Sequence, residues 1–268
     1  MKSGNLSKEV LAELVAITRL AGDAILEVYS QEFAVSHKAD HSPLTQADMV
    51  SHHIICDALR ELDPGTPVLS EESADIPFSE RRRWREYWLV DPLDGTREFV
   101  NRNGEFTVNI ALIRDHVPLV GVVHVPVTGV SYFGAQGLGA FKQAGNDNAL
   151  PISVRRPVAN PVVVVGSRSH ANPALEQKLQ EIGAYEFVAM GSSLKFCLVA
   201  EGKADFYPRL GPTSEWDTAA AQAVVEASGG HVVTLEGSAL RYNTRDGLLN
   251  PEFLVFGDEK TDWPGLMA

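Results

Sequence analysis

The chain has 268 residues, of which 44% are hydrophobic, so it is long and apolar enough to bury a core. Asp and Glu outnumber Lys and Arg by 35 to 23, which gives a formal net charge of −12. A nucleic-acid polymer is therefore excluded as the expected partner, because binding a phosphate backbone requires a basic face. The two cysteines, Cys56 and Cys197, stand among apolar residues and are expected to be buried, reduced thiols.

The N-terminal residues lack the apolar core of a signal peptide, and no stretch approaches the ~18 uninterrupted apolar residues of a membrane span. We therefore expect a soluble, cytoplasmic protein without an integral membrane segment. Peripheral attachment to the cytoplasmic face of the inner membrane and assembly into a homodimer are both compatible with the sequence.

Residues 1–150 are predicted to form an α+β half. Residues 6–29 carry apolar side chains every three or four positions, which is typical of one face of a helix. A second helix is predicted from Thr45, its expected N-cap, to Leu62. Short apolar runs separated by turn residues then predict a largely antiparallel sheet. Its expected strands are 66–69, 87–90, 107–113, 119–124 and 130–133.

Between the first two of these strands lies a basic run, Arg81-Arg82-Arg83-Trp84-Arg85. Charged residues are mostly exposed in folded proteins, so we expect this run to be a solvated loop or helix face.

Residues 151–268 are predicted to form an α/β half, because strand and helix patterns alternate there. The expected strands are 162–165, 187–189, 205–207 and 231–234, and the expected helices are 173–182, 193–201 and 215–228. The boundary near residue 150 is placed at a stretch rich in Gly, Asn and Asp.

Paired carboxylates mark the most informative segment, in which an apolar strand runs into Asp91-Pro92-Leu93-Asp94-Gly95-Thr96. Hard cations such as Mg²⁺ take oxygen ligands, so two carboxylates and a turn carbonyl suit such an ion. Alone, this pattern is more typical of an ordinary Asp-rich turn. A phosphoaspartyl phosphatase of the haloacid dehalogenase kind would carry D-x-D, one residue shorter, and remains a weaker alternative.

Further carboxylates occur at the end of a predicted strand or in the first turn of a predicted helix. Glu71 and Glu72 end another apolar strand, and Asp217 lies in the first turn of a predicted helix. Asp217 follows Ser214 by three residues, as in a capping box, and Asp48 follows Thr45 in the same way. Capping is compatible with catalysis, because a helix N-terminus stabilises an ionised carboxylate.

Together these motifs resemble a known family. Glu71-Glu72-Ser73, Asp91 to Thr96 and Trp216-Asp217-Thr218-Ala219-Ala220 occur in the order found in the Mg²⁺-dependent, lithium-sensitive phosphatases of the inositol monophosphatase superfamily. The segments 38–48, 167–170 and 212–217 are similar to those of its bacterial CysQ-type 3'(2'),5'-bisphosphate nucleotidases. Inositol monophosphatases commonly carry Cys where this chain has Glu215, which counts against an inositol phosphate as the main substrate.

The resemblance implies a fold and a set of roles. The fold is an α+β, layered α-β-α-β-α sandwich with a cleft between the halves. Asp48 and Thr96 would orient and deprotonate the attacking water, with Glu71 also catalytic. Two or three Mg²⁺ ions would be held by Glu71, Asp91, the Leu93 carbonyl, Asp94 and Asp217. Substrate would contact Glu71, Leu93, Asp94, Gly95, Thr96, His170, Ser192, Lys195, Arg209 and Asp217.

The implied reaction is hydrolysis of 3'-phosphoadenosine 5'-phosphate, a small nucleotide bisphosphate, to AMP and phosphate in sulfur assimilation. Gly191-Ser192-Ser193 is expected to open a helix, which would place Ser192 and Lys195 one turn apart at an anion site. An isolated Lys or Arg is more typical of solvated surface, so only the family spacing favours these positions. An inositol or sugar phosphatase of the same superfamily and a non-catalytic Mg²⁺/nucleotide sensor remain alternatives.

Overall fold

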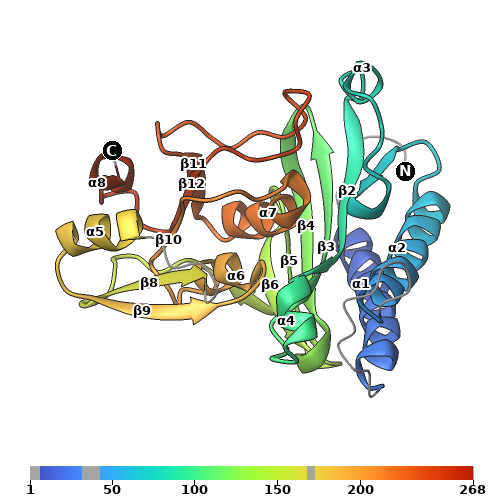
Figure 1. Cartoon of the computed structure of the whole chain (residues 1–268), viewed down its shortest axis with the longest axis horizontal. Helices are drawn as coiled ribbons and strands as arrows, with labels where there is room; N and C mark the ends of the chain where they lie inside the picture. Colours follow the sequence, from blue (N-terminus) through green and yellow to red (C-terminus); the bar gives the residue numbers. More distant parts are fainter. Residues whose placement is uncertain (1–6, 32–42, 168–172, 268) are drawn as a thin grey trace.

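The computed structural model describes residues 7–31, 43–167 and 173–267 as five layers in the order α-β-α-β-α (Figure 1). This arrangement confirms the predicted layered sandwich. The outer and middle layers contain α1 (Lys8–Tyr29), α2 (Pro43–Leu62), α5 (Pro173–Glu181), α6 (Leu194–Ala200), α7 (Ala219–Ala227) and α8 (Trp263–Met267). The other helical segments connect strands, namely α3 (Phe78–Arg81), α4 (Thr96–Val100) and the single 3₁₀ turns η1 (Glu71–Ser73), η2 (Pro126–Thr128) and η3 (Glu215–Asp217).

The first sheet has seven strands whose spatial order follows the chain. β1 is parallel to β2, and every later pair is antiparallel. The strands are β1 (Val68–Ser70), β2 (Glu86–Asp94), β3 (Thr107–Arg114), β4 (Val117–Val125), β5 (Val130–Ala135), β6 (Gly139–Ala144) and β7 (Leu150–Ile152).

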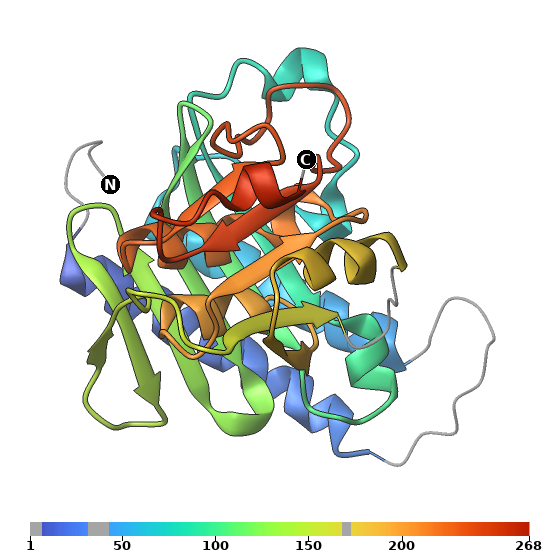
Figure 2. The same cartoon turned by 90° about the vertical axis from the view of Figure 1, so that its left-hand side faces the viewer.

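The second sheet has the order β11-β12-β10-β8-β9. β8 pairs in parallel with β9 and β10, whereas β12 is antiparallel to β10 and β11. Its strands are β8 (Val162–Ser167), β9 (Tyr185–Met190), β10 (Phe206–Arg209), β11 (His231–Thr234) and β12 (Phe253–Phe256). Figure 2 views the molecule from the side of the second sheet, which lies in front of α6 and α7.

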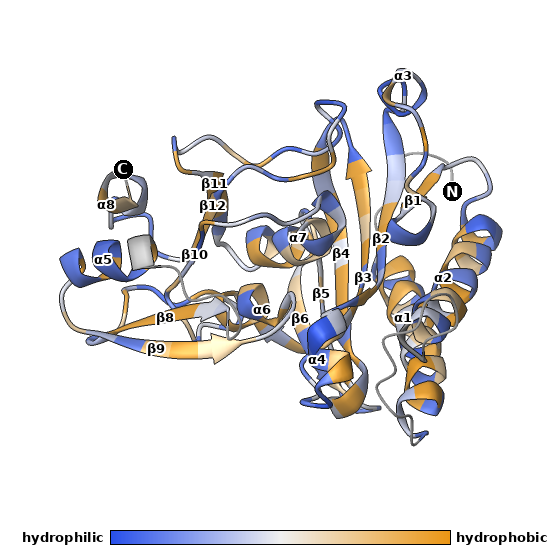
Figure 3. Ribbon diagram, viewed as in Figure 1, coloured by the Kyte–Doolittle hydropathy of each residue, from blue (hydrophilic) through white to orange (hydrophobic). Residues whose placement is uncertain are grey.

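Alternation of side chains along β3 explains why helices cover both faces of the first sheet. Val108, Ile110 and Leu112 belong to the buried cluster that contains the apolar faces of α1 and α2. Ala111 and Ile113 belong to the cluster that contains α6 and α7. β3 and β4 are accordingly mostly hydrophobic, and α1 and α2 have one apolar face each (Figure 3).

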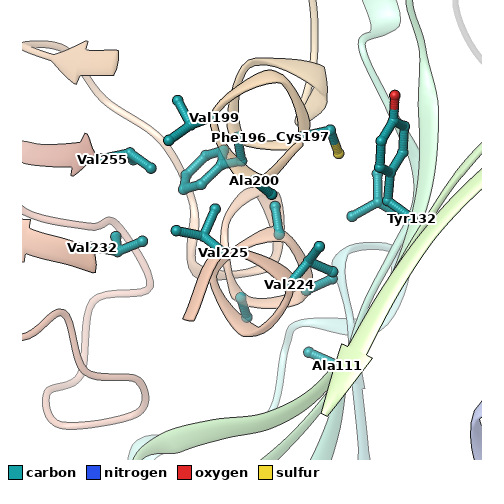
Figure 4. Packing of buried hydrophobic residues seen from close by; sticks show 14 of the residues in the cluster. Ala111, Tyr132, Phe196, Cys197, Val199, Ala200, Val224, Val225, Val232 and Val255 are labelled. Carbon is teal, nitrogen blue, oxygen red and sulfur yellow. The ribbon is translucent and has the colours of Figure 1, made fainter. Parts of the chain in front are cut away.

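The middle layer joins the two sheets. Phe196, Val199, Val224 and Val225 from its two helices pack together between the sheets (Figure 4). Helix α7 approaches β4 so closely that a Cβ on Gly121 would lie 1.9 Å from the backbone oxygen of Ala220. Only glycine leaves room for this approach, which fixes the depth of α7 against the sheet.

The structure corrects several details of the sequence analysis. Helix α2 begins at Pro43, so Thr45 lies inside the first turn and is not its N-cap. Arg81 is 2% exposed, whereas Arg82, Arg83 and Arg85 are exposed as predicted. The helix predicted at 215–228 is divided into η3 and α7, and β6, β7 and β12 were not predicted.

Other expectations hold or remain open. Cys56 and Cys197 are buried and free, as predicted. Within the described ranges, no helix combines the length and the apolar character that crossing a bilayer requires. The division into residues 1–150 and 151–268 remains a prediction.

Candidate active site

An irregularity in β2 brings Asp91 and Asp94 onto the same face of the sheet. Asp91 pairs with Asn109 and Asp94 pairs with Thr107, so three steps along β2 match two steps along β3. Residues three apart point to opposite faces of a regular strand, but one extra residue in a bulge reverses this. The backbone N–H of Leu93 donates to Asp91 Oδ1 at 3.1 Å within the bulge. The strand therefore presents both carboxylates at one point.

Asp217 reaches the same point from η3, far along the chain. Its carboxylate accepts a 2.8 Å hydrogen bond from the backbone N–H of Ser214, in the capping box that the sequence predicted. One carboxylate oxygen from each of Asp91, Asp94 and Asp217 lies within 4.8 Å of the other two. Three oxygen ligands so close together match the donor set that a hard divalent cation requires.

Backbone and hydroxyl donors hold Asp94 in place. The Ser193 N–H and the Ser192 hydroxyl donate to Asp94 Oδ2 at 2.7 Å and 2.6 Å. The Ser193 hydroxyl lies 2.8 Å from the same oxygen and 2.7 Å from the backbone carbonyl oxygen of Asp217. Ser193 thus links the two segments that bring carboxylates to the site.

Crowding and burial raise the pKa of the Asp91 and Asp217 carboxyl groups. The pKa of Asp91 lies well above its usual value, because the group is desolvated and faces the charges of Asp94, Glu71 and Asp217. Desolvation and the charge of Asp94 raise the pKa of Asp217 to about 7. Such a cluster is unfavourable unless a cation compensates it, so the residues present fit a divalent metal ion.

Two further predicted carboxyl groups, those of Glu71 and Asp48, lie at the edge of this cluster. Glu71, in η1, hydrogen-bonds the Asp91 side chain, and desolvation with the charge of Glu72 raises the pKa of Glu71 to about 7. Desolvation, followed by the charges of Glu72 and Glu71, raises the pKa of Asp48 to about 8. Thr96 is exposed and begins α4, which packs against the helix that carries Asp48. The carboxyl groups of this edge are therefore electrostatically coupled to the three aspartates.

A pocket of about 130 Å³ adjoins the cluster, and its lining comes from residues 94–98 and from residues between 167 and 218. It brings two of the predicted metal ligands, Asp94 and Asp217, together with the predicted substrate contacts Gly95, Ser192, Lys195 and Arg209. The residues that line it include Asp94, Gly95, Ser167, Gly191, Ser192, Ser193, Lys195, Tyr207, Arg209, Thr213 and Asp217. Gly95 has a φ of 103°, a left-handed conformation that glycine adopts without strain, and it turns β2 into α4 beside this pocket.

Lys195 and Arg209 supply positive charge to the pocket. Lys195 is 6% exposed, and its Nζ donates to the backbone oxygen of Ser192 at 2.5 Å. Desolvation lowers the pKa of Lys195 to about 8, although Asp94 opposes this change. Arg209 donates from Nη2 to the backbone oxygen of Pro212 at 2.8 Å. With Arg97, three cationic side chains thus line a cavity that is also lined by the carboxylates of Asp94, Glu98 and Asp217.

One expected detail of this region is wrong, and one lies outside the described residues. Ser192 has a φ of 52° and precedes α6, so it occupies a left-handed turn and not the helix. The two residues therefore do not stand one turn apart on a helix as predicted; Ser192 contacts Lys195 through its backbone carbonyl oxygen. His170 lies outside the described residues.

Sequence reasoning missed Ser193, Thr107 and Asn109 as polar contacts of the site. The Thr107 hydroxyl and the Asn109 amide each lie 3.4 Å from Asp94 Oδ2. Only their positions opposite Asp94 and Asp91 in the β2–β3 register reveal them. A predicted antiparallel pairing of these two strands could have found both residues, whereas Ser193 depends on a contact between distant segments.

Comparisons with known proteins agree with this geometry. A model of the inositol monophosphatase family matches residues 6–260. The chain is 50% identical over 249 residues to the 3'(2'),5'-bisphosphate nucleotidase CysQ of Escherichia coli K12, which covers 92% of this chain and 99% of that relative. It is 39% identical over 271 residues to the CysQ of Aggregatibacter actinomycetemcomitans, with 96% of each chain covered.

Solved structures show the same relationship. The crystal structure of CysQ from Bacteroides thetaiotaomicron has a TM-score of 0.85 and 40% identity, and covers 93% of this chain and 97% of its own. Inositol monophosphatase from Anabaena has a TM-score of 0.76 at 24% identity, covering 97% and 94%, and shares the fold. This chain belongs to the inositol monophosphatase family.

Proposed function

We propose that this protein is an Mg²⁺-dependent 3'(2'),5'-bisphosphate nucleotidase that hydrolyses 3'-phosphoadenosine 5'-phosphate to AMP and phosphate, as part of sulfur assimilation. One observation carries the proposal: a single pocket joins the carboxylates Asp94 and Asp217 to the cations Lys195 and Arg209. A substrate with two separated phosphates can place one on each side of such a pocket. The relatives that match nearly the whole chain carry the same activity in their names.

The carboxylate side of the pocket fits Mg²⁺. Asp91, Asp94 and Asp217 would hold it, with Glu71 and the Leu93 carbonyl as further oxygen ligands, for two or three ions in all. When bound, Mg²⁺ lowers the pKa of a water molecule and neutralises charge on the phosphate and the leaving oxygen.

The attacking water is assigned to Asp48 and Thr96. The water oxygen forms a bond to phosphorus, the bond from phosphorus to the ribose 3' oxygen breaks, and that oxygen takes up a proton from a solvent water molecule. Asp48 accepts the proton that the water loses, and the Thr96 hydroxyl orients the water from the start of α4. Desolvation and the charges of Glu72 and Glu71 make the Asp48 carboxylate a stronger base than an exposed one.

The opposite side of the pocket would receive the 5'-phosphate. The Lys195 ammonium group is buried, so few water molecules must leave it when a phosphate binds. The phosphate then accepts a charge-assisted hydrogen bond from Lys195. Arg209 adds a second cation, and the Ser192 hydroxyl lies between this side and Asp94. His170 is proposed as a further contact.

Phosphate release with Mg²⁺ tests this assignment on three substrates at equal concentration: 3'-phosphoadenosine 5'-phosphate, inositol 1-phosphate and fructose 1,6-bisphosphate. We expect the adenosine bisphosphate to have the highest kcat/KM and EDTA to stop its turnover. A preference for either of the other two would support the inositol or sugar phosphatase instead. Binding of the adenosine bisphosphate without phosphate release would support the non-catalytic sensor.

A further inference from the structure

Arg81 occupies an unusual place for a member of a basic run. It ends α3, in the connection between β1 and β2 that leads from Glu71 to Asp91. Its side chain is 2% exposed, and guanidinium groups are almost never buried to this extent unless they are paired. The segment that carries two of the proposed metal ligands is therefore anchored by a buried cation.

Asn243 is the principal partner of Arg81. Arg81 Nη1 donates to Asn243 Oδ1 at 2.7 Å, and Asn243 Nδ2 donates back to the backbone oxygen of Arg81 at 2.7 Å. Asn243 is 1% exposed and has a φ of 53°, a conformation that asparagine tolerates better than most residues. The two residues thus exchange hydrogen bonds across 162 positions of the chain.

Glu215 completes the connection to η3. The backbone N–H of Asn243 lies 2.8 Å and 2.9 Å from the two carboxylate oxygens of Glu215, which is 2% exposed. Glu215 and Asp217 belong to the same 3₁₀ turn. The Glu215 side chain does not line the pocket beside Asp94, so it is not placed to touch a substrate there.

Charge makes this arrangement sensitive to the loss of any member. Arg81 and Glu215 carry opposite charges on either side of Asn243, and the polar groups around them include Tyr87, Tyr242 and Arg245. A buried charge without its partner is strongly unfavourable, because it has lost the stabilisation by water. Removing one member therefore shifts the others instead of leaving them in place.

We propose that Arg81, Asn243 and Glu215 form a buried clamp that sets the position of Asp217 relative to Asp91 and Asp94 and thereby the affinity of the site for Mg²⁺. The clamp joins the β1–β2 connection, which leads from Glu71 to Asp91, to η3, which carries Asp217. Its members are positioning residues, since they act through Asp217. The inference rests on the proposed function only in taking Asp217 as a metal ligand.

Calorimetric titration of Mg²⁺ into the full-length protein tests the clamp without using substrate. Glu215→Ala removes the acceptor, and Asn243→Gly removes the bridging side chain while keeping a residue that accepts positive φ. We expect each variant to raise the Kd for Mg²⁺ about tenfold, the effect typical of residues that orient metal ligands. Glu215→Gln retains one acceptor oxygen, so it should weaken binding less than Glu215→Ala does.

Steady-state kinetics give an independent reading. The Mg²⁺ concentration for half-maximal hydrolysis of 3'-phosphoadenosine 5'-phosphate should rise in parallel with the Kd. The substrate KM at saturating Mg²⁺ should change less than twofold, because the clamp lies outside the pocket. A wild-type protein that binds Mg²⁺ but hydrolyses none of this substrate would contradict the proposed function and leave the clamp testable by calorimetry.

Arg155→Ala is the matched control, because Arg155 pairs with the buried Asp205 at 2.8 Å beside the second sheet, outside the metal cluster. It should lower the melting temperature and leave the Kd for Mg²⁺ unchanged. If the clamp variants lower the melting temperature in the same way and keep the Kd within twofold of wild type, the clamp is only structural and the proposal is overturned. Should Glu215→Ala fail to fold, Asn243→Gly and Glu215→Gln decide the question.

Discussion

The two segments that bring carboxylates to this site are built in different ways. Asp91 and Asp94 lie at the end of β2, a strand of nine residues, and the register with β3 determines where both side chains point. Asp217 lies in a single 3₁₀ turn, which is positioned by Ser193, Glu215 and the packing of α7. The sheet provides rigid main-chain hydrogen bonds, whereas η3 depends on side chains from distant parts of the chain.

This difference has a consequence for mutation. Main-chain pairing survives most side-chain substitutions, so the first segment should tolerate most changes other than those of its ligands and of the Ser192 and Ser193 contacts to Asp94. The second segment should be sensitive to substitutions that touch no ligand, because its position depends on packing and buried polar contacts.

Asp94→Asn should give the largest effect, at the point where the two segments meet. A neutral amide is a poorer metal ligand and removes one negative charge, so turnover should fall roughly a thousandfold or more, equivalent to about 4 kcal/mol of barrier. Circular dichroism should show an intact fold, and the exposed Asp147→Asn serves as the control. Near-normal Mg²⁺-dependent turnover in Asp94→Asn would refute the carboxylate assignment.

Gly121→Ala should damage the second segment without changing any ligand. The added methyl group would meet the Ala220 backbone oxygen, so α7 must move away from β4. Overpacking of this kind should lower the free energy of unfolding by about 3 kcal/mol, measured by urea denaturation. Gly65→Ala is the control, since nothing lies within 4 Å of its added Cβ. A wild-type stability for Gly121→Ala would show that α7 is not tightly docked.

His124 tests the first sheet at its junction with α1. Burial and the nearby Arg19 guanidinium lower the pKa of His124 to about 4, from an ordinary value of 6.5. Between pH 6.5 and 4 the unfolded chain therefore binds more protons at this residue than the folded one. The stability contributed by neutral His124 is present above pH 6.5 and is lost as the pH falls, in total by about 3 kcal/mol.

Urea denaturation of the wild type and His124→Gln at pH 7 and pH 5 measures this effect. We expect the wild type to lose more stability between these pH values than the variant, which no longer carries the titrating ring. Equal losses in both proteins would remove His124 as a source of acid sensitivity.

Lys195→Ala should give the smallest effect and is the most selective test of the substrate. It removes one charge-assisted hydrogen bond to the 5'-phosphate, so kcat/KM for 3'-phosphoadenosine 5'-phosphate should fall by tens of fold, about 2 kcal/mol. Turnover of 3'-AMP, which lacks that phosphate, should change much less. An equal loss on both substrates would indicate that Lys195 mainly holds the Ser192 carbonyl oxygen, which it contacts at 2.5 Å.

The contrast between the β2 segment and η3 also explains which features could be predicted from the sequence. The repeat of apolar residues in α1 and the apolar run 87–90 are local signals, and both predictions are confirmed, although β2 extends to Asp94. The strand β6 was missed because its sequence, Gly139 to Ala144, contains glycine, lysine and glutamine, which are depleted in strands or neutral. Local patterns therefore located the first carboxylate segment well.

Local sequence patterns could not predict the contacts between residues that are distant in the chain. Arg81 stands in a run of arginines, and its burial follows from Asn243, which lies 162 positions away. Ser192 precedes a helix that begins one residue later than predicted, and its left-handed φ follows from the contacts of the loop with Asp94 and Lys195. The positions of these side chains depend on the packed halves together, so no window of sequence contains them.

The central claim is that the two segments together hold the metal ions on which hydrolysis depends. Anomalous diffraction from crystals soaked in Mn²⁺, used as a substitute for Mg²⁺, measures this directly. The account predicts anomalous peaks in contact with carboxylate oxygens of both Asp94 and Asp217, with Asp91 and the Leu93 carbonyl as neighbouring ligands. Ordered Mn²⁺ that contacts carboxylates of only one segment, or that lies elsewhere on the molecule, would contradict it.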